Sequence, residues 1–345
     1  FYTATVYEKG AELVRMLKRI IGADAFARGM QLYFERRDGT ASTVEDFIAC
    51  FEDAAGKSLK PFMRWYDQAG TPELRLRSTF DAASKTLRLD LVQQTPPTPG
   101  QSSKLPMPIP LQIGLIAQDG APLATRLGAE SEARMEHHVV FDDAATTLTF
   151  AGVSETPIAS VMRGFSAPVR LIDPLSSHDR LVQMAHDPDP FTRWEAGQSL
   201  ARAIMLGDQQ LSAANLALAL GRELERAQED PALAALTLRL PDLNELILAS
   251  PAPDPDALFV QRENLRRTVA EALRDQLERI ARAKGEVPFS PNAEAAGRRA
   301  LKAAALDLLA SLGPAGLFSE AYASATCMTE TMAALEALGA AGGDD

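Results

Sequence analysis

Histidine is the first residue type to consider, because a metal site in a protein is most often built around it. The four histidines are His137, His138, His178 and His186, and none of them stands in an HExxH frame. His137 and His138 are neighbours on an expected strand, so their side chains point to opposite faces and cannot readily share a metal. His178 and His186 flank an expected turn, where surface or capping roles are favoured over a metal site. We therefore expect this chain to hold no metal ion of its own.

A nucleophilic triad or a phosphate site is not supported by the sequence either. The serines lack a GxSxG turn, and neither Cys50 nor Cys327 has a nearby cluster of His or Lys that would activate its thiol. The sequence contains no glycine-rich phosphate loop and no dinucleotide fingerprint. Paired arginines such as Arg36 and Arg37 are interleaved with acids, which predicts solvated helix faces at these positions.

Tyr7 is the remaining candidate for chemistry, in the segment Tyr7-Glu8-Lys9-Gly10. A helical run, residues 11–17, follows this segment directly. Taken alone, a tyrosine at the start of an amphipathic helix is most often an interface residue with its hydroxyl in water. The elements around Tyr7 therefore decide whether it has a rigid mount.

Residues 5 to 70 have the apolar spacing of three and four that is typical of helices, with Leu13 and Leu17 on the buried stripe of the first one. Gly22 is expected to end this helix, and Asp24 to cap a second one that runs to about Arg36. Two further helices are expected to start at Ser42–Thr43 and at Pro61, with the second ended by Gly70.

At Pro72 the apolar period changes from helical to two, as in Leu87, Leu89 and Leu91. The pattern predicts five to seven short strands in about 100 residues, which is the signature of a small antiparallel sandwich. The prolines from Pro96 to Pro110 are expected at edges and connections, where no ladder donor is needed. Expected strands beyond the first hairpin are 109–115, 139–141, 146–150 and 158–162.

After Pro168 the pattern returns to helix and stays helical. The segments are rich in Ala, Leu, Arg and Glu, and Gly, Pro or Asp separates them. We find no strict repeat period, although paired helices of this kind often stack into a curved solenoid. The expected helices are 193–205, 211–227, 257–284 and 293–310.

Length and composition indicate a soluble globular protein with more than one domain. A chain of 345 residues is too long for one ordinary core, and 46% hydrophobic and 23% charged residues argue against extensive disorder. The net charge of -11 disfavours nucleic acid or an anionic membrane surface as the main partner, because either would need a basic patch. Two distant cysteines predict no disulfide framework and favour a reducing, cytoplasmic location. No stretch approaches the roughly 20 apolar residues of a membrane span.

The segment Tyr7-Glu8-Lys9-Gly10 with its helix resembles the catalytic tyrosine segment of the zinc aminopeptidases of the M1 family, in particular the bacterial alanyl aminopeptidase type. The segment from Arg64 to Pro72 resembles the one that ends the catalytic domain of that family and leads into its β-sandwich. The first motif alone is weak evidence for the family. The ordered set of matches, together with the succession of helices, sandwich and helices, is specific evidence for it. Further matches, in the order that the family requires, are 31–36, 165–169 and 191–200.

The resemblance implies a role for Tyr7. In the family, this tyrosine donates its phenolic hydrogen bond to the oxyanion that forms when zinc-activated water attacks the peptide carbonyl. A neutral phenol with a pKa of about 10 is a donor at neutral pH, and it helps only if it is mounted rigidly. Packing through Leu13, Leu17 and Ile20 would provide that mount, and Gly10 would let the helix approach neighbouring backbone closely. Glu8 and Lys9 belong to the motif but are assigned no chemistry.

The resemblance also implies that Tyr2 lines the pocket for the first side chain of the substrate, although simple packing of Tyr2 is about as well supported. The zinc-binding HExxH helix, the third zinc-binding Glu and the Gly-Ala-Met-Glu-Asn exopeptidase motif of the family have no counterpart in this sequence. The sequence starts with Phe1 rather than Met, within what resembles a motif. We therefore interpret it as part of a longer zinc enzyme, in which zinc is bound outside this chain.

The expected fold is multidomain α+β. Residues 1–71 would form the helical end of a thermolysin-like catalytic domain, 72–168 an Ig-like β-sandwich, and 169–345 the start of a helical, solenoid-like domain. The expected function is removal of N-terminal residues from peptide substrates, with Ala, Arg and Lys as candidates. The expected partner is the remaining N-terminal part of the catalytic domain, without which the isolated chain should be inactive.

A second hypothesis comes from another class of protein. The sandwich and the helical segment could form a non-catalytic module that binds peptides or proteins, which would also explain the missing motifs. An exposed apolar face on residues 1–71 would favour the aminopeptidase hypothesis, and a closed, polar surface there would favour the binding module.

Overall fold

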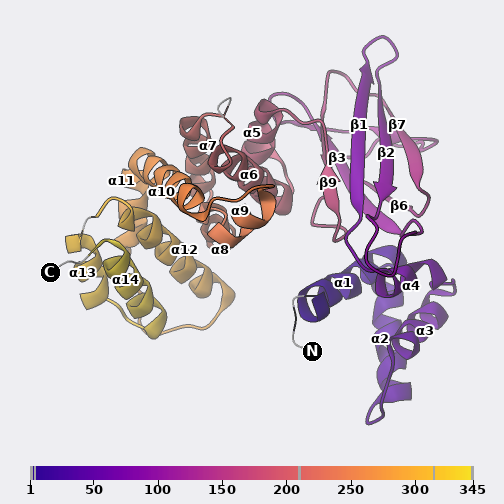
Figure 1. Cartoon of the computed structure of the whole chain (residues 1–345), viewed down its shortest axis with the longest axis horizontal. Helices are drawn as coiled ribbons and strands as arrows, with labels where there is room; N and C mark the ends of the chain where they lie inside the picture. Colours follow the sequence, from indigo (N-terminus) through magenta and orange to yellow (C-terminus); the bar gives the residue numbers. More distant parts are fainter. Residues whose placement is uncertain (1–2, 4, 209–210, 314, 343–345) are drawn as a thin grey trace. The chain divides into compact units, whose positions relative to one another are not determined.

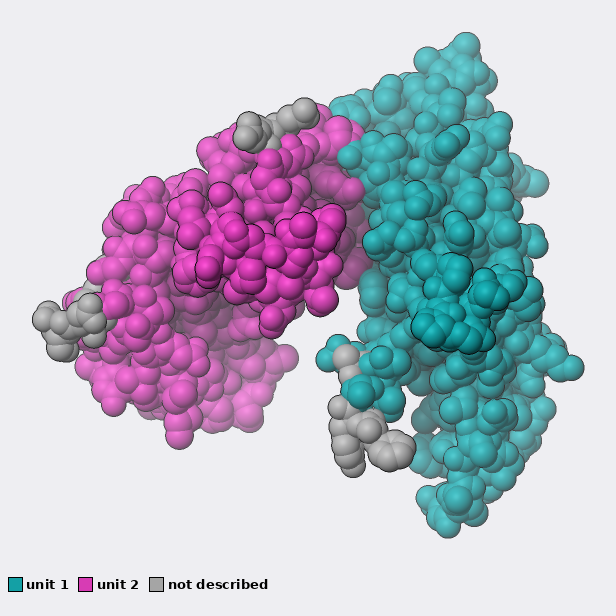
Figure 2. Space-filling view, viewed as in Figure 1, with its two compact units in different colours: residues 1–175 teal, residues 176–345 magenta. Residues whose placement is uncertain are grey.

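The computed structural model describes residues 3, 5–208, 211–313 and 315–342. The chain divides into two compact units, residues 1–175 and residues 176–345, which Figure 2 shows in teal and magenta.

Unit 1 opens with short helices whose ends follow local sequence signals. Gly22 ends the first α-helix with a φ of 86°, which favours glycine, and Thr43 caps a later one through a capping box with Asp46. Asp24 lies in the first turn of its helix rather than at the cap, because that helix already begins at Ala23. The elements are η1 (Thr5–Lys9), a π-helical turn, α1 (Gly10–Ile21), α2 (Ala23–Arg37), α3 (Val44–Ala55) and α4 (Lys60–Asp67).

Helix α4 ends at Asp67, three residues before the predicted stop at Gly70. Gln68 leaves the helical conformation because its side-chain amide binds across to Leu105: its Nε2 donates to the Leu105 carbonyl at 3.0 Å, and its Oε1 accepts from the Leu105 amide at 2.6 Å. Gly70 then has a φ of 98° and forms the tight connection into the first strand.

The sandwich consists of two sheets, as predicted from the period of two. One sheet has the order β5-β7-β2-β1-β9, and the other has β4-β3-β6 with β8 also paired to β3. Figure 1 shows β1, β2 and β7 side by side. The bounds are β1 (Glu73–Asp81), β2 (Thr86–Gln94), β3 (Ile109–Ile116), β4 (Pro122–Leu123), β5 (Arg126–Leu127), β6 (His137–Phe141), β7 (Ala145–Ala151), β8 (Ile158–Val161) and β9 (Arg170–Ile172).

Two details of the sandwich differ from the expectation. β9 pairs with β1 in parallel, so not every pairing is antiparallel. Pro110 lies inside β3, in register with Val140 of β6, rather than in a connection. β8 pairs with β3 only from Ile113 onward, so β3 has a neighbouring strand on one side only at Pro110. Proline is tolerated at such an edge.

One hydrophobic core joins the helices of unit 1 to its sheets. Leu17, Phe51 and Trp65 from α1, α3 and α4 belong to the same buried cluster as Leu87 and Leu89 of β2. Each of these side chains is at most 3% exposed. The helical segment is therefore packed on the sandwich as part of one body.

The regular elements among the described residues of unit 2 are all helices. The predicted helix 257–284 is two helices that meet at Leu273, whose φ of -107° and ψ of 12° break the α-helical path. Aspartates cap several starts, as Asp189 does for α6 and Asp230 for α8. The helices are α5 (Ser177–His186), α6 (Pro190–Met205), α7 (Ala213–Glu225), α8 (Pro231–Leu238), α9 (Leu243–Ala249), α10 (Pro255–Ala272), α11 (Arg274–Ala281), α12 (Ala293–Ala310), α13 (Ala315–Ala323) and α14 (Met328–Ala340).

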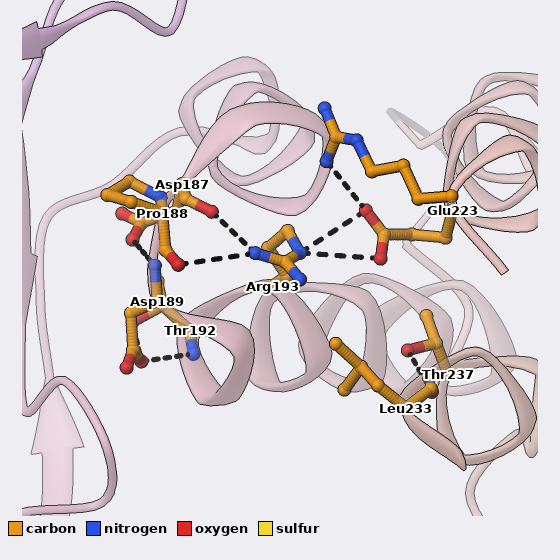
Figure 3. A network of polar contacts seen from close by, with 9 residues as sticks. Asp187, Pro188, Asp189, Thr192, Arg193, Glu223, Leu233 and Thr237 are labelled. Carbon is orange, nitrogen blue, oxygen red and sulfur yellow. Dashed lines mark hydrogen bonds and ion pairs between the residues drawn. The ribbon is translucent and has the colours of Figure 1, made fainter. Parts of the chain in front are cut away.

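A buried ion network holds α6 against α7 (Figure 3). Arg193 of α6 lies with Nε 3.3 Å from the carboxylate of Glu223, which is only 4% exposed, and Arg226 approaches the same carboxylate at 3.2 Å. The Nη1 of Arg193 also donates to the Asp187 carbonyl at 2.9 Å. These contacts satisfy a charge that would otherwise be costly to bury, so we assign this network a structural role.

Glu195 of α6 gives a prediction about pH. Burial raises the pKa of this carboxyl above its ordinary value of 4.5, an effect that Arg202 opposes. The folded state therefore keeps the proton to a higher pH than the unfolded chain, and the free energy of unfolding decreases as pH rises through that interval. We expect Glu195→Gln to be more stable than the parent chain at pH 7, by less than about 1 kcal/mol or about 2–4 °C in Tm.

Thermal unfolding followed by circular dichroism at pH 7 and pH 4 would check this expectation. The advantage of Glu195→Gln should disappear at pH 4, where the parent carboxyl is protonated in the folded state. The exposed Glu229 is the control: its carboxylate stays in water, so Glu229→Gln should change the Tm little. A variant that is equally or less stable at pH 7 would contradict the prediction.

Candidate functional site

Tyr7 lies in the π-helical turn η1 that leads into α1. No residue of this turn is buried, and the Tyr7 side chain is 57% exposed. At the start of the turn, the amides of Val6 and Tyr7 both donate to the Thr3 carbonyl at 3.0 Å. Short π-helical turns of this kind are rare and occur often at functional sites.

Lys9 connects this turn to the start of the sandwich. Its Nζ donates to the carbonyl of Gly70 at 2.8 Å, across 61 residues of sequence. Burial lowers the pKa of the Lys9 ammonium from its ordinary value. Sequence reasoning gave Lys9 no chemistry, and the structure shows that it makes a tertiary contact.

Helix α1 is fixed by its apolar face and by two arginines. Leu13 and Leu17 are buried as expected, at 3% and 0% exposure, and Ile20 packs against the same core. On another face, Arg15 donates to the carbonyls of Gly164 and Phe165 at 2.8 and 2.7 Å. These contacts give the Tyr7 turn a firmly placed helix behind it.

The segment that receives the arginines has an unusual backbone. Met162 and Phe165 have φ values of 66° and 51°, in the left-handed region that most residues avoid, and Gly164 between them has 59°. Arg19 also donates to the Gly164 carbonyl at 2.8 Å. Arg15 and Arg19 are four residues apart on one helix face, which sequence could have shown, but their acceptors are backbone carbonyls that no sequence pattern marks.

The segment 64–72 has the structural role that its sequence suggested. Trp65 is 3% exposed, and its indole Nε1 donates to the Pro108 carbonyl at 2.9 Å. Arg64 Nη1 donates to the Pro106 carbonyl at 2.6 Å. The proline-rich loop thus supplies acceptors that hold α4 at the edge of the sandwich.

The other sequence predictions about the site have different outcomes. Tyr2 lies outside the described residues. The close approach of backbone expected at Gly10 is not seen, since a Cβ atom built there would meet nothing within 4 Å in the described chain. His178 and His186 both lie on α5 rather than on either side of a turn. His137 is buried with Nε2 3.1 Å from the Thr125 hydroxyl, whereas His138 is exposed, as expected for neighbours on a strand.

The described residues do not fit a zinc ion. Among them no group of three or more His, Cys, Asp or Glu side chains is placed to hold a metal.

The same part of the chain contains no helix that is both long and apolar enough to cross a membrane.

Three family models cover nearly the whole chain. Residues 1–66 match the peptidase family M1 domain, and residues 70–174 match a domain of unknown function, DUF3458, described as an Ig-like fold. Residues 177–345 match its companion, DUF3458_C, described as ARM repeats. These models confirm the expected order of catalytic-domain helices, sandwich and helical solenoid.

Curated relatives and a solved structure agree with the models. Aminopeptidase N of Caulobacter vibrioides is 44% identical over 90% of this chain and 36% of its own length. Aminopeptidase N of Escherichia coli is 37% identical over 99% of this chain and 40% of its own length. The crystal structure of Legionella pneumophila aminopeptidase A in complex with aspartic acid is 27% identical with a TM-score of 0.81, over 98% of this chain and 39% of that one.

The chain thus spans about two fifths or less of the length of each of these proteins. Within that span the similarity is continuous, and it runs through all three family models. Residues 1–66 thus belong to the peptidase family M1 domain, and over nearly its whole length the chain is similar to enzymes of the aminopeptidase N type.

Proposed function

We propose that this chain forms part of a zinc-dependent aminopeptidase that removes N-terminal residues from peptides, and that Tyr7 is its oxyanion donor. The observation that carries the proposal is the match of residues 1–66 to the peptidase family M1 domain, with Tyr7 presented at an exposed turn on a well-packed helix. The relatives named aminopeptidase N support the same activity.

The chemistry proposed for Tyr7 needs only its phenol. When the scissile carbonyl becomes tetrahedral, its oxygen gains negative charge, and a neutral phenol can donate a hydrogen bond to it without losing its own proton. The donor must already point at that oxygen, because reorientation during the reaction would cost much of the benefit. The packing of α1 on the core and on the 162–165 turn supports this requirement.

The proposed partner is the remaining part of a catalytic domain, which would also carry the zinc ligands. Val6, Tyr7 and Phe34 on the helical segment are each more than half exposed. Large apolar side chains at such positions support a surface that another part of the protein covers. A cytoplasmic location, inferred from the two cysteines, is part of the same proposal.

The test is hydrolysis by the full-length enzyme of 4-nitroanilides of alanine, arginine and lysine. We expect release of nitroaniline that is lost after treatment with a chelator and restored by zinc. An enzyme that is inactive on all three substrates, or whose activity is unaffected by metal removal, would refute the proposal.

The chain of residues 1–345 alone is expected to show no hydrolysis, with or without added zinc. Its described residues contain no metal cluster, and the printed sequence lacks the exopeptidase motif that would hold the α-amino group of a substrate. The assay is the same, with the full-length enzyme at equal concentration as the positive control. Zinc-dependent turnover by residues 1–345 would show that the essential groups are present in this chain after all.

A further inference from the structure

Burial of its own side chains does not hold the π-helical turn that carries Tyr7 in place. Its residues Thr5 to Lys9 are all at least partly exposed. An oxyanion donor, however, must be held in position to a fraction of an ångström. A polar contact from the turn itself to a fixed point would meet this need.

Lys9 makes such a contact, and it does so without an acidic partner. Its Nζ bonds to the Gly70 carbonyl at 2.8 Å, and no carboxylate forms an ion pair with it in the described chain. The Lys9 ammonium is partly buried without a counter-charge, which lowers its pKa. Its contact with Gly70 is therefore formed against a desolvation cost.

The acceptor of this bond is itself firmly held. Gly70 has a φ of 98°, and a Cβ atom at this position would meet the Thr95 methyl at 3.4 Å. The preceding carbonyl, that of Ala69, accepts from Lys104 Nζ at 2.9 Å, and the Ala69 amide donates to Gln101 Oε1 at 2.8 Å. The carbonyl that Lys9 binds therefore lies in the connection between α4 and β1, and Gln101 and Lys104 cross-link this connection to the loop between β2 and β3.

We propose that Lys9 is a positioning residue for the Tyr7 phenol: its bond to the Gly70 carbonyl fixes the π-helical turn against the start of the sandwich. The inference rests on the proposed function of Tyr7. It gives the sandwich a part in catalysis, because the sandwich and its loop hold the point to which the turn is tied.

The test uses Lys9→Met and Lys9→Arg in the full-length zinc enzyme. Lys9→Met keeps the length of the aliphatic side chain and removes the donor, and it should lower kcat by about 10- to 100-fold with KM changed less than about twofold, because only the transition state uses the phenol. Lys9→Arg retains a donor and should recover part of the loss.

Lys57→Met is the matched control. Lys57 Nζ donates to the Ile20 carbonyl at 2.9 Å, so this variant removes the same kind of bond at the opposite end of α1. We expect it to change kcat by less than about twofold, since that end of the helix does not carry the phenol. A kcat for Lys9→Met that matches the wild type, or an equal loss in Lys57→Met, would overturn the proposal.

A double-mutant cycle with Tyr7→Phe separates positioning from general stability. If Lys9 acts through the phenol, adding Lys9→Met to Tyr7→Phe should reduce kcat by less than about a further twofold. Independent, multiplying losses would overturn the role of Lys9. A Tyr7→Phe enzyme with nearly full activity would instead refute the proposed oxyanion function, so the two failures can be distinguished.

Discussion

Replacing Tyr7 by phenylalanine in the full-length enzyme should lower kcat by about 10²- to 10³-fold, the loss typical of removing one oxyanion donor. The change deletes one hydroxyl and keeps the ring. Because the donor would act on charge that exists only in the transition state, KM should stay nearly unchanged while kcat and kcat/KM fall together. The Tm should also stay nearly unchanged, because the side chain is 57% exposed.

Tyr33→Phe is the control for loss of a phenol elsewhere on the helical segment. Tyr33 lies on α2, edge-on to Phe47 with ring centroids 5.0 Å apart, so phenylalanine preserves its ring contact. We expect wild-type kinetics from it. Steady-state kinetics on alanine 4-nitroanilide measure both variants, and a Tyr7→Phe enzyme that loses affinity but keeps kcat would show that Tyr7 only binds substrate.

Replacing Lys302 by methionine should destabilise the helical unit by about 3–5 kcal/mol, the cost typical of breaking a buried ion pair. Lys302 on α12 and Glu330 on α14 are 6% and 5% exposed, and their charged groups lie 3.6 Å apart. Lys302 Nζ also donates to the Ala283 carbonyl at 3.0 Å. Removing the ammonium leaves the Glu330 carboxylate buried without its cation.

The double variant Lys302→Met with Glu330→Gln should lose less stability than Lys302→Met alone. Glutamine removes the uncompensated charge and keeps an oxygen that can accept from the Thr326 amide, as Glu330 does at 2.9 Å. Arg267→Met is the surface control: Arg267 pairs with Glu271 at 3.1 Å, both side chains are more than half exposed, and the expected cost is less than about 1 kcal/mol.

Unfolding of residues 1–345 followed by helical circular dichroism measures these costs. A loss for Lys302→Met no larger than that of Arg267→Met would show that the buried pair contributes little. A double variant that is less stable than the single one would show that the carboxylate stabilises the fold without its cation.

Local sequence signals predicted most of the elements. Gly22 and the Thr43–Asp46 capping box marked helix ends because they act on the backbone within a few residues. The period of two predicted β2, whose residues Leu87, Leu89 and Leu91 are all fully buried. The break of the long helix at Leu273 was missed, since no Gly or Pro marks it.

The sequence by itself also selected Tyr7, through the similarity of its segment to a known family rather than through any property of a tyrosine. Only the tertiary structure identified what holds that segment. The Lys9 bond to Gly70 spans 61 residues, and those of Arg15 to Gly164 and Phe165 span 149 and 150. In each case the acceptor is a backbone carbonyl. Every residue has that group, so side-chain identity cannot show which carbonyl the fold will bring to a particular cation.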